Sequence, residues 1–271
     1  YSHNNRNTTY FNAEGIIEND QAQIKEGATS VFVEYTRQFG NLQMQAGLRY
    51  ENVGFNYYDS GKHMKEQSKN YNNVFPSISF SFPIKDVQIM LGYTNDISRP
   101  SYWNLRSNIT YVNRYMYDKG NPFLMPSLSH NVTLGASYKW INLYVGYSHI
   151  MDEMINQTVA WSEDDPTIAL LTLVNSPEYD KLVASLNLSP TIGVWTPQLG
   201  LALQQQWYNA NTPVGVEKFN KPVGSITLRN NFNLPGGFIF DVAGDLTTKG
   251  HSTNACMNEA RFDIGASIYK S

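Results

Sequence analysis

The chain has 271 residues and a formal net charge of −3, which leaves no electrostatic basis for binding nucleic acid. Aromatic residues make up 13% of the sequence and charged residues only 16%, below the roughly 25% that is usual for soluble domains. The single cysteine, Cys256, excludes an intrachain disulfide framework and a cysteine-based zinc site. This composition suggests that part of the surface faces something other than water.

The hydrophobic pattern predicts strands and no helices. No apolar run approaches the roughly 20 residues of a transmembrane helix, and no stretch keeps a 3.6-residue period for two turns. Apolar and polar residues alternate instead: Ile78, Phe80 and Phe82 alternate with serines, and the same pattern continues from Asn131 to Trp140. A period of two residues predicts β-strands with one apolar and one polar face.

Twelve strands are expected, joined by turns that are alternately short and long. The strands are predicted at residues 8–18, 28–39, 42–55, 71–82, 86–97, 127–139, 141–161, 167–189, 194–209, 221–234, 237–248 and 258–270. The short connections lie at residues 40–41, 83–86, 139–142, 191–193 and 235–237. Long polar connections lie near 55–70, 98–127, 209–221 and 249–257, and a tall hairpin is expected to fold over at Asp164-Asp165-Pro166.

Strand length and loop asymmetry favour a membrane barrel. The predicted strands are about 10–14 residues or longer, whereas strands of globular proteins cluster near 5–6 and a spanning strand needs about 9–11. Short turns at one end and long loops at the other are typical of outer-membrane barrels, whose closed sheet pairs every backbone group in hydrocarbon. The sequence therefore predicts an all-β fold, an antiparallel up-and-down transmembrane β-barrel that crosses the cell outer membrane many times. Aromatic residues at strand ends suit its interfacial girdles: Tyr50, Tyr93, Trp140, Tyr147, Trp207 and Tyr269.

The most specific passage is residues 98–131, SRPSYWNLRSNITYVNRYMYDKGNPFLMPSLSHN. It resembles the β-barrel of TonB-dependent outer-membrane receptors, in particular their outer-membrane β-barrel subfamily. The matching parts are Ser98-Arg99-Pro100, Leu105-Arg106, Gly120-Asn121-Pro122 and Leu128-Ser129-His130-Asn131, with support from LQMQAGLRY (42–50) and FPSISF (75–80).

This resemblance implies uptake of a scarce nutrient through a 22-stranded barrel that is plugged by an N-terminal domain. The plug would couple to an energy-supplying protein of the inner membrane, and the outer wall would contact membrane lipid and lipopolysaccharide. Residues 1–271 are accordingly expected to form a single β-barrel domain from the C-terminal half of a larger receptor. The plug domain and the last strands are expected to lie outside this sequence.

Functions other than transport are also compatible with this pattern. The main alternative is a structural or adhesive outer-membrane barrel that binds partners through long extracellular loops. An enzyme is disfavoured because no nucleophile, base and orienting group can be named, and no cofactor or metal site is expected, since the five histidines show no ligand spacing. A soluble β-sandwich binding module is the alternative without a membrane.

Two sets of residues are candidates for function. In the loop at 98–127, aromatic rings and guanidinium groups could stack on sugars or planar ligands and bind carboxylates or phosphates. The competing interpretation is that the prolines and the motif hold a folded loop against the barrel wall. The candidate ligand-binding residues are Arg99, Tyr102, Trp103, Arg106, Tyr111, Arg114 and Tyr117.

The second set consists of charges on the polar face, which are expected to line the lumen. Because both signs occur on one face, they predict cross-strand ion pairs along the wall, with a role in a substrate pathway or in plug contact left open. These residues are Arg49, Glu51, Arg229, Asp241, Asp245, Arg261 and Asp263.

Overall fold

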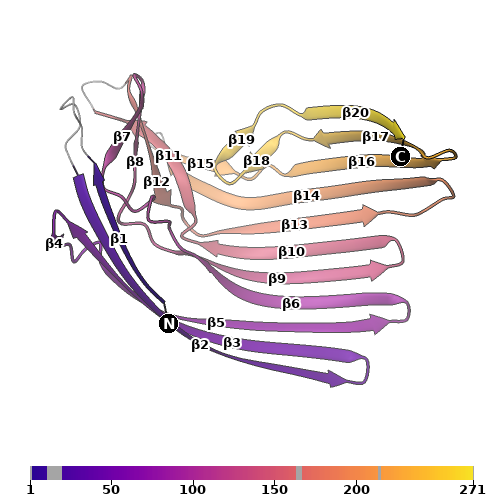
Figure 1. The fold of residues 1–271 in the computed structure, drawn as a ribbon, viewed down its shortest axis with the longest axis horizontal. Coiled ribbons are helices and arrows are strands. Elements are labelled where there is room, and N and C mark those ends of the chain that lie inside the picture. Colours follow the sequence, from indigo (N-terminus) through magenta and orange to yellow (C-terminus); the bar gives the residue numbers. More distant parts are fainter. Residues whose placement is uncertain (1, 11–19, 163–166, 213–214, 271) are drawn as a thin grey trace.

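The computed structural model describes residues 2–10, 20–162, 167–212 and 215–270. Its main element is a large antiparallel sheet in which twelve strands follow one another in chain order, with short strands inserted in the loops (Figure 1). The twelve strands are β1 (Ser2–Tyr10), β2 (Asp20–Phe39), β3 (Leu42–Asp59), β5 (Lys69–Ile84), β6 (Val87–Ser98), β9 (Ser127–Tyr138), β10 (Ile141–Met151), β13 (Tyr179–Leu188), β14 (Trp195–Thr212), β16 (Val223–Leu234), β17 (Phe238–Thr247) and β20 (Arg261–Lys270). The predicted all-β, up-and-down arrangement and its number of strands are confirmed. No helix among the described residues is long and apolar enough to cross a membrane.

The predictions of one continuous strand at residues 141–161 and another at residues 167–189 are wrong, because each range contains two strands. Residues 141–161 break after β10 at Asp152, whose φ of 55° lies in the left-handed region and ends the ladder. Residues 167–189 break at Pro177, which has no N–H to donate. The pieces β11 (Met154–Ala160) and β12 (Ala169–Asn175) leave the main sheet.

Smaller differences concern strand ends. The first strand begins at Ser2 and not at residue 8, and residues 11–18 of that prediction lie outside the described residues. β2 begins at Asp20, eight residues earlier than predicted. The expected hairpin tip, Asp164-Asp165-Pro166, also lies outside the described residues.

The long polar connections contain strands of their own. β7 (Ile109–Asn113) and β8 (Met116–Lys119) join the β11–β12 hairpin in a four-stranded sheet with the order β11-β12-β8-β7. β8 and β12 pair in parallel, so two loops from different parts of the sequence share one sheet. The remaining short strands are β4 (Lys62–His63), β15 (Gly215–Phe219), β18 (Gly250–Ser252) and β19 (Ala255–Met257).

The pairing register gives the main sheet one apolar face. Residues directly opposite one another in antiparallel strands point to the same side of the sheet. One such row consists of Met44, Phe80, Leu91, Leu134, Val145, Ala184 and Leu203. A second row consists of Phe82, Ile89, Ala136, Leu143, Leu186, Leu201, Ile226, Leu246 and Phe262.

Few charges lie on this apolar face. Within the twelve described strands, the Asp, Glu, Lys and Arg residues that share its register are Lys25, Arg37, Asp180 and Lys270. Tyr35, Tyr93 and Tyr147 lie in one row across the strands, and Tyr93 and Tyr147 belong to the aromatic residues predicted for the girdles. An apolar band bordered by aromatic and charged residues is the expected surface for contact with hydrocarbon.

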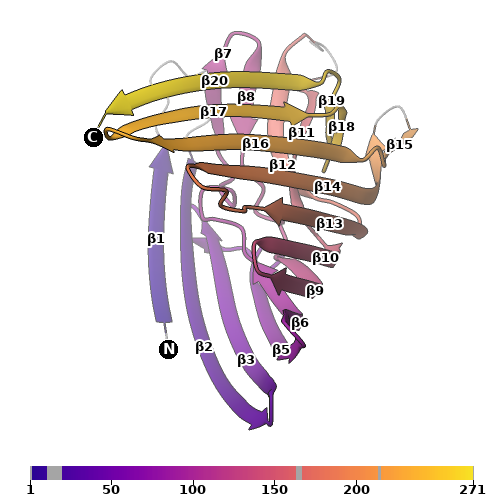
Figure 2. The same ribbon diagram turned by 90° about the vertical axis from the view of Figure 1, so that its right-hand side faces the viewer.

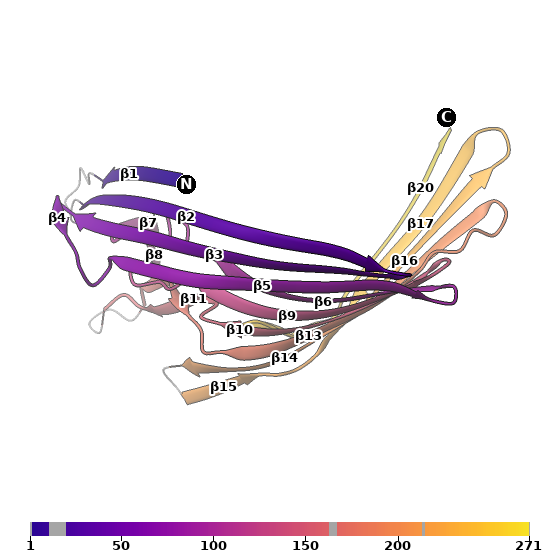
Figure 3. The same ribbon diagram turned by 90° about the horizontal axis from the view of Figure 1, so that it is seen from below.

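The sheet is curved, and β7, β8, β11 and β12 lie on its concave side (Figure 2). Tight turns gather at one end of the long strands and the larger loops at the other (Figure 3). Gly40 and Gly236 provide left-handed residues in two of these turns, with φ of 60° and 83°. The pairing path runs from β1 to β20 without joining these two edges among the described strands, so the sheet is an open, curved wall.

Candidate functional site

Two long loops pack against the concave face of the wall. We call them together the inner loop module: residues 99–126 between β6 and β9, and residues 152–162 and 167–178 between β10 and β13. On β3, the residues that face away from the apolar side are buried: Glu51, Val53, Phe55 and Tyr57 are 8%, 2%, 7% and 1% exposed. Since their side chains point to the concave side, the module is what covers them.

An apolar cluster joins the wall to the module. The wall contributes Phe55 and Tyr57 of β3 and two residues of β2, and the loop contributes Leu105 and Leu124. Met154 and Leu173 of the second loop pack against the same cluster. Each apolar side chain that is fully buried stabilises such a contact by about 1.5–3 kcal/mol. The cluster therefore holds both loops to one patch of the wall.

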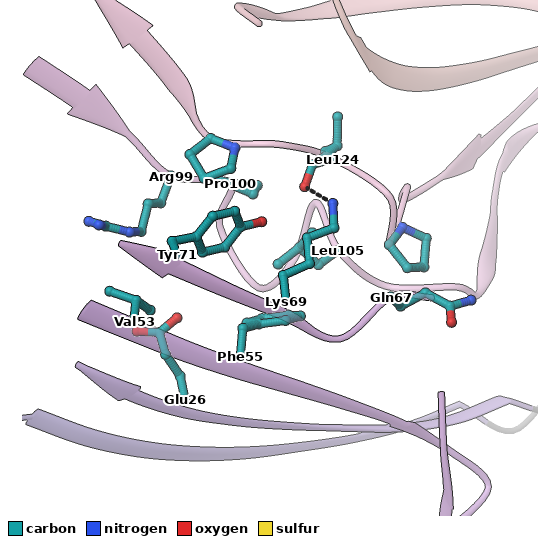
Figure 4. Close-up of a pocket in the computed structure, with 12 residues that line it drawn as sticks. Glu26, Val53, Phe55, Gln67, Lys69, Tyr71, Arg99, Pro100, Leu105 and Leu124 are labelled. Atoms are coloured by element: carbon teal, nitrogen blue, oxygen red, sulfur yellow. Dashed lines mark hydrogen bonds between the residues drawn. The ribbon is translucent and has the colours of Figure 1, made fainter. Parts of the chain in front are cut away.

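Polar contacts fix the same joint. The Lys69 ammonium donates to the carbonyl oxygens of Phe123, at 2.8 Å, and Leu124, at 3.1 Å, as Figure 4 shows for Leu124. Arg99 donates to the buried Glu51 carboxylate, and Arg49 Nη1 lies 3.8 Å from the other carboxylate oxygen. Members of the two predicted sets thus meet here, Arg99 from the loop set and Arg49 and Glu51 from the lumen set.

The cavity at this joint is too small for a nutrient. It has a volume of about 20 Å³ and lies between Val53, Phe55, Lys69, Arg99 and Leu124 (Figure 4). A volume of this size accommodates about one water molecule. The contact between module and wall is therefore a packed joint.

Arg106, predicted to bind ligand, is buried within the loop at 3% exposure. Its Nη2 donates to Asp118 at 2.6 Å, its Nη1 donates to the Trp103 carbonyl at 2.8 Å, and its guanidinium stacks 3.9 Å from the Trp103 ring centroid. The guanidinium group is thus held between the Asp118 carboxylate and the Trp103 indole. In this arrangement the guanidinium of Arg106 holds the loop together, and its contact with a ligand stays a prediction.

We predict that Gly120→Ala loosens the loop. A Cβ at residue 120 would lie 2.4 Å from the Arg106 carbonyl oxygen and 2.9 Å from its amide nitrogen, so backbone must move. Overpacking of this kind costs about 1–3 kcal/mol, and native-state hydrogen exchange of residues 103–122 should detect it as a lower opening free energy. Gly54→Ala is the control, because a Cβ there has no neighbour within 4 Å. Equal protection in the two variants would contradict the prediction.

Two asparagines connect the two loops of the module. Asn121 Nδ2 donates to the Leu173 carbonyl at 2.9 Å. Asn175 accepts from the Met125 amide at 2.8 Å, and its Nδ2 donates to the carbonyl oxygens of Met125, at 2.9 Å, and Asp152, at 2.8 Å. One side chain therefore bonds to the backbone of both loops.

Asn175→Ala is expected to separate the loops without unfolding the wall. It leaves three backbone groups without their partner, and about 1–3 kcal/mol is lost for each such group that stays out of water. We expect faster hydrogen exchange in residues 116–125 and unchanged exchange in β6 and β9. Asn156→Ala serves as the comparison, since Asn156 is an exposed asparagine of the same hairpin. Uniform acceleration over the whole sheet would refute a role limited to the module.

The remaining loop candidates lie in two places. Tyr102 packs against the apolar cluster, where burial, followed by the Glu26 carboxylate, raises the pKa of its hydroxyl. Tyr111 and Tyr117 meet edge to face at 5.9 Å, and Tyr117 lies 4.6 Å from Trp161 of the other loop. Trp161 was missed in the sequence because nothing local indicates that its hairpin reaches this one.

The aromatic residues around β7 and β8 remain the accessible part of the predicted ligand set. Tyr111 is 58% exposed and Tyr115 is 55% exposed, with the Arg114 guanidinium 4.4 Å from the Tyr115 ring centroid. Trp103, although stacked on Arg106, is still 47% exposed. Contact of these residues with a ligand stays a prediction.

The other lumen candidates lie on β16, β17 and β20, on the face opposite the apolar rows; they are Arg229, Asp241, Asp245, Arg261 and Asp263. The expected ion pairs between opposite charges are wrong for these strands. Asp245 lies directly opposite Asp263, and the ion pairs of arginine among the described residues involve Glu51 and Asp118 only. The apolar face determines the pairing register of the strands, and this register determines which charged residues lie opposite one another.

Comparison with known proteins supports the fold. The family model for the outer membrane protein beta-barrel family matches residues 1–271. No curated protein sequence matches the chain. The FrpB iron transporter from Neisseria meningitidis (F3-3 variant) is similar in structure, with a TM-score of 0.63, 13% identity and coverage of 94% of this chain and 39% of that one.

Two further solved structures share the fold. The copper transporter OprC has a TM-score of 0.62 and 11% identity, with coverage of 97% of this chain and 43% of its own. The siderophore receptor PirA from Pseudomonas aeruginosa has a TM-score of 0.56 and 10% identity, with coverage of 99% and 50%. This chain thus spans half or less of the length of these proteins.

The sheet, its apolar face and the family match agree over the full length of the sequence. The apolar band accounts for a location in the outer membrane, which the strands cross in alternating directions. The chain belongs to the outer membrane protein β-barrel family.

Proposed function

We propose that this chain is the wall of an outer-membrane receptor that imports a scarce nutrient, resembling the TonB-dependent receptors. In this proposal residues 1–271 are part of a single barrel domain, and a plug domain and further strands lie outside the sequence. The plug couples to an inner-membrane protein that supplies energy, and the apolar face contacts lipid and lipopolysaccharide. The similar structures are named as transporters of iron and copper and as a siderophore receptor, which supports a small, scarce substrate for this chain as well.

The observation that carries the proposal is the position of the inner loop module. Both loops fold onto the concave side of the wall. Lys69, Arg99 and Leu124 fix the first loop there, and Met154 and Leu173 of the second loop pack against the same apolar cluster. Loops in this position narrow the space that the wall encloses, and their residues face whatever passes through it. A wide diffusion channel keeps most of that space filled with water, whereas the interior of other barrels is occupied by loops.

The adhesive alternative receives less support from the same observation. An adhesive barrel needs its long loops to extend toward an external partner. Here residues 99–126 use Arg99 and a set of apolar side chains for contact with the wall, and Lys69 of the wall bonds to their backbone. A chemical reaction is not part of the proposal, because binding and passage account for the groups found at the site.

The test uses cells that lack the gene and cells in which it is restored. We expect the deletion strain to grow more slowly when one nutrient, such as copper or siderophore-bound iron, is limiting. Uptake of that labelled nutrient should fall, and an uncoupler that dissipates the inner-membrane gradient should reduce uptake in the restored strain to the deletion level. Normal uptake of every limiting nutrient, together with reduced attachment of cells to a matrix, would favour the adhesive barrel instead.

A further inference from the structure

A cleft of about 450 Å³ lies between β11 of the inner loop module and the β14–β15 hairpin. This volume falls within the roughly 300–1,000 Å³ of ligand pockets. β11 contributes residues 155–158, β14 contributes Tyr208 and Ala210, and β15 contributes Glu217 and Phe219. The cleft is distinct from the joint at Lys69 and contains none of the residues predicted to bind ligand.

The strands border this cleft in different ways. β14 and β15 contribute every second residue, which means that a face of their hairpin forms one side. β11 contributes four consecutive residues, Ile155, Asn156, Gln157 and Thr158. Residues 174–177, where β12 ends and the chain turns toward β13, line the cleft as well, so the cleft follows β11 and the end of β12.

The edge of β11 is open. In the four-stranded sheet, β11 is the outermost strand and pairs with β12 alone among the described strands. A free strand edge presents a row of backbone N–H and C=O groups that can pair with another extended chain. The question is which residues direct these groups into the cleft.

Hydrogen bonds beside β11 answer this question. Glu153 and Trp161 bond toward β12: the Glu153 carbonyl accepts from the Ser176 amide at 2.7 Å, and the Trp161 amide donates to the Ile168 carbonyl at 2.8 Å. Backbone direction alternates along a strand, so the odd-numbered residues pair with β12 and the even-numbered ones point away from it. Asn156 and Thr158 therefore direct their N–H and C=O groups toward the cleft.

Two side-chain contacts agree with this assignment. Leu173, which lies opposite Asn156, gives its carbonyl to Asn121 on the far side of β12. Asn254, in the β18–β19 turn, donates its amide to the Asn156 carbonyl at 2.8 Å. The Asn254 side-chain amide thus donates to the same carbonyl oxygen that would accept from the N–H of an added strand, and a bound peptide would replace it.

We propose that the edge of β11 binds an extended peptide by strand addition, with the peptide lying in the cleft over β14 and β15. The outward groups repeat every second residue, roughly 6.6 Å apart, which matches an extended peptide backbone. Residues 155–158 span roughly 13 Å, enough for three or four peptide residues. The Glu217 carboxylate in the lining favours a lysine or arginine in the peptide. This site does not depend on transport, since binding needs neither the plug nor an energy source.

Binding is tested on the intact protein in detergent micelles. The probe is a fluorescein-labelled hexapeptide of alternating valine and lysine, measured by fluorescence anisotropy. We expect saturable binding, at least about tenfold weaker binding when all peptide amides are N-methylated, and no displacement by maltohexaose. Absence of peptide binding, equal affinity of the methylated peptide, or displacement by the saccharide would each overturn the proposal.

A matched pair of variants tests the edge itself. Thr158→Pro removes the N–H that points into the cleft but leaves the bonds to β12, and proline is tolerated at a free edge. Thr158→Ala removes the same side chain and keeps the N–H. We expect Thr158→Pro to weaken peptide binding about tenfold and Thr158→Ala to stay within about twofold of the original protein. Equal binding by the two variants would refute strand addition.

Circular dichroism shows whether the Thr158→Pro variant folds. If it does not fold, Glu217→Gln is the second variant that tests the site. This exposed side chain carries the cleft's carboxylate, so its replacement should weaken binding of the lysine-containing hexapeptide about threefold or more and leave an alternating valine and threonine peptide unaffected. Unchanged binding of both peptides would contradict the placement of the peptide over β15. Loss of uptake in cells with normal peptide binding would count against the transport function and not against this site.

Discussion

Leu124→Ala is expected to lower the free energy that holds the inner loop module to the wall by about 2–5 kcal/mol. The Leu124 side chain is 1% exposed and packs in the cluster that includes Phe55, Tyr57 and Leu105. Its removal leaves a cavity that the wall, fixed by its strand pairing, can fill only in part. Hydrogen exchange of residues 99–126 in the micelle-bound protein measures this free energy directly.

Phe123→Ala provides the control for this prediction. Phe123 is the preceding residue, has a large apolar side chain and is 52% exposed. We expect its replacement to change the opening free energy by less than about 1 kcal/mol, and the pairing within β3 and β5 to remain protected in both variants. If the two variants behaved alike, the apolar cluster would not be what anchors the module.

Leu228→Arg is expected to reduce the stability of the folded wall in lipid by about 2–4 kcal/mol, the cost of an arginine on the lipid face near the bilayer midplane. Leu228 is 44% exposed and lies in a row with Leu199 and Ile264 on the apolar face. Urea titration of the protein folded into phosphatidylcholine vesicles measures the change.

The control for this substitution is its neighbour, Thr227→Arg. Thr227 points to the opposite face and lies across from Asp245, whose carboxylate can pair with the new guanidinium. We expect that variant to fold with a stability within about 1 kcal/mol of the original protein. A larger loss for Thr227→Arg than for Leu228→Arg would mean that the faces of the sheet have been assigned the wrong way round.

Much of the wall could be predicted from the sequence because its information is local. The alternation in strands such as 77–82 and 131–140 sets which residues share a face, and a slip of one residue would turn the whole apolar face toward water. The short turns, with Gly40 and Gly236, were located for the same reason. The breaks at Asp152 and Pro177 were missed although the sequence marks both, with the polar pair Asp152-Glu153 and the polar run at residues 175–178. The expectation of one tall hairpin over residues 141–189 overrode these local signals.

The candidate site was predicted only in part. Gly120-Asn121-Pro122 was interpreted as a motif that shapes a loop, and the contacts of Gly120 with Arg106 and of Asn121 with Leu173 support that interpretation. Lys69 and Asn175 were not identified, since each acts on backbone groups about 50 residues away in the sequence. A side chain that bonds to a distant carbonyl leaves no local pattern.

By itself, the sequence determined the all-β class, the number of strands in the wall, the apolar face and the place of the long loops. The period of two and the turn residues encode these features without reference to distant parts of the chain. Only the tertiary structure decided that residues 99–126 turn to the concave side, that β8 pairs in parallel with β12, and that the edge of β11 stays open. These features depend on which surfaces meet after the wall has curved. The hydrophobic effect that drives such contacts is non-directional, so no local sequence pattern specifies which apolar surfaces will pair.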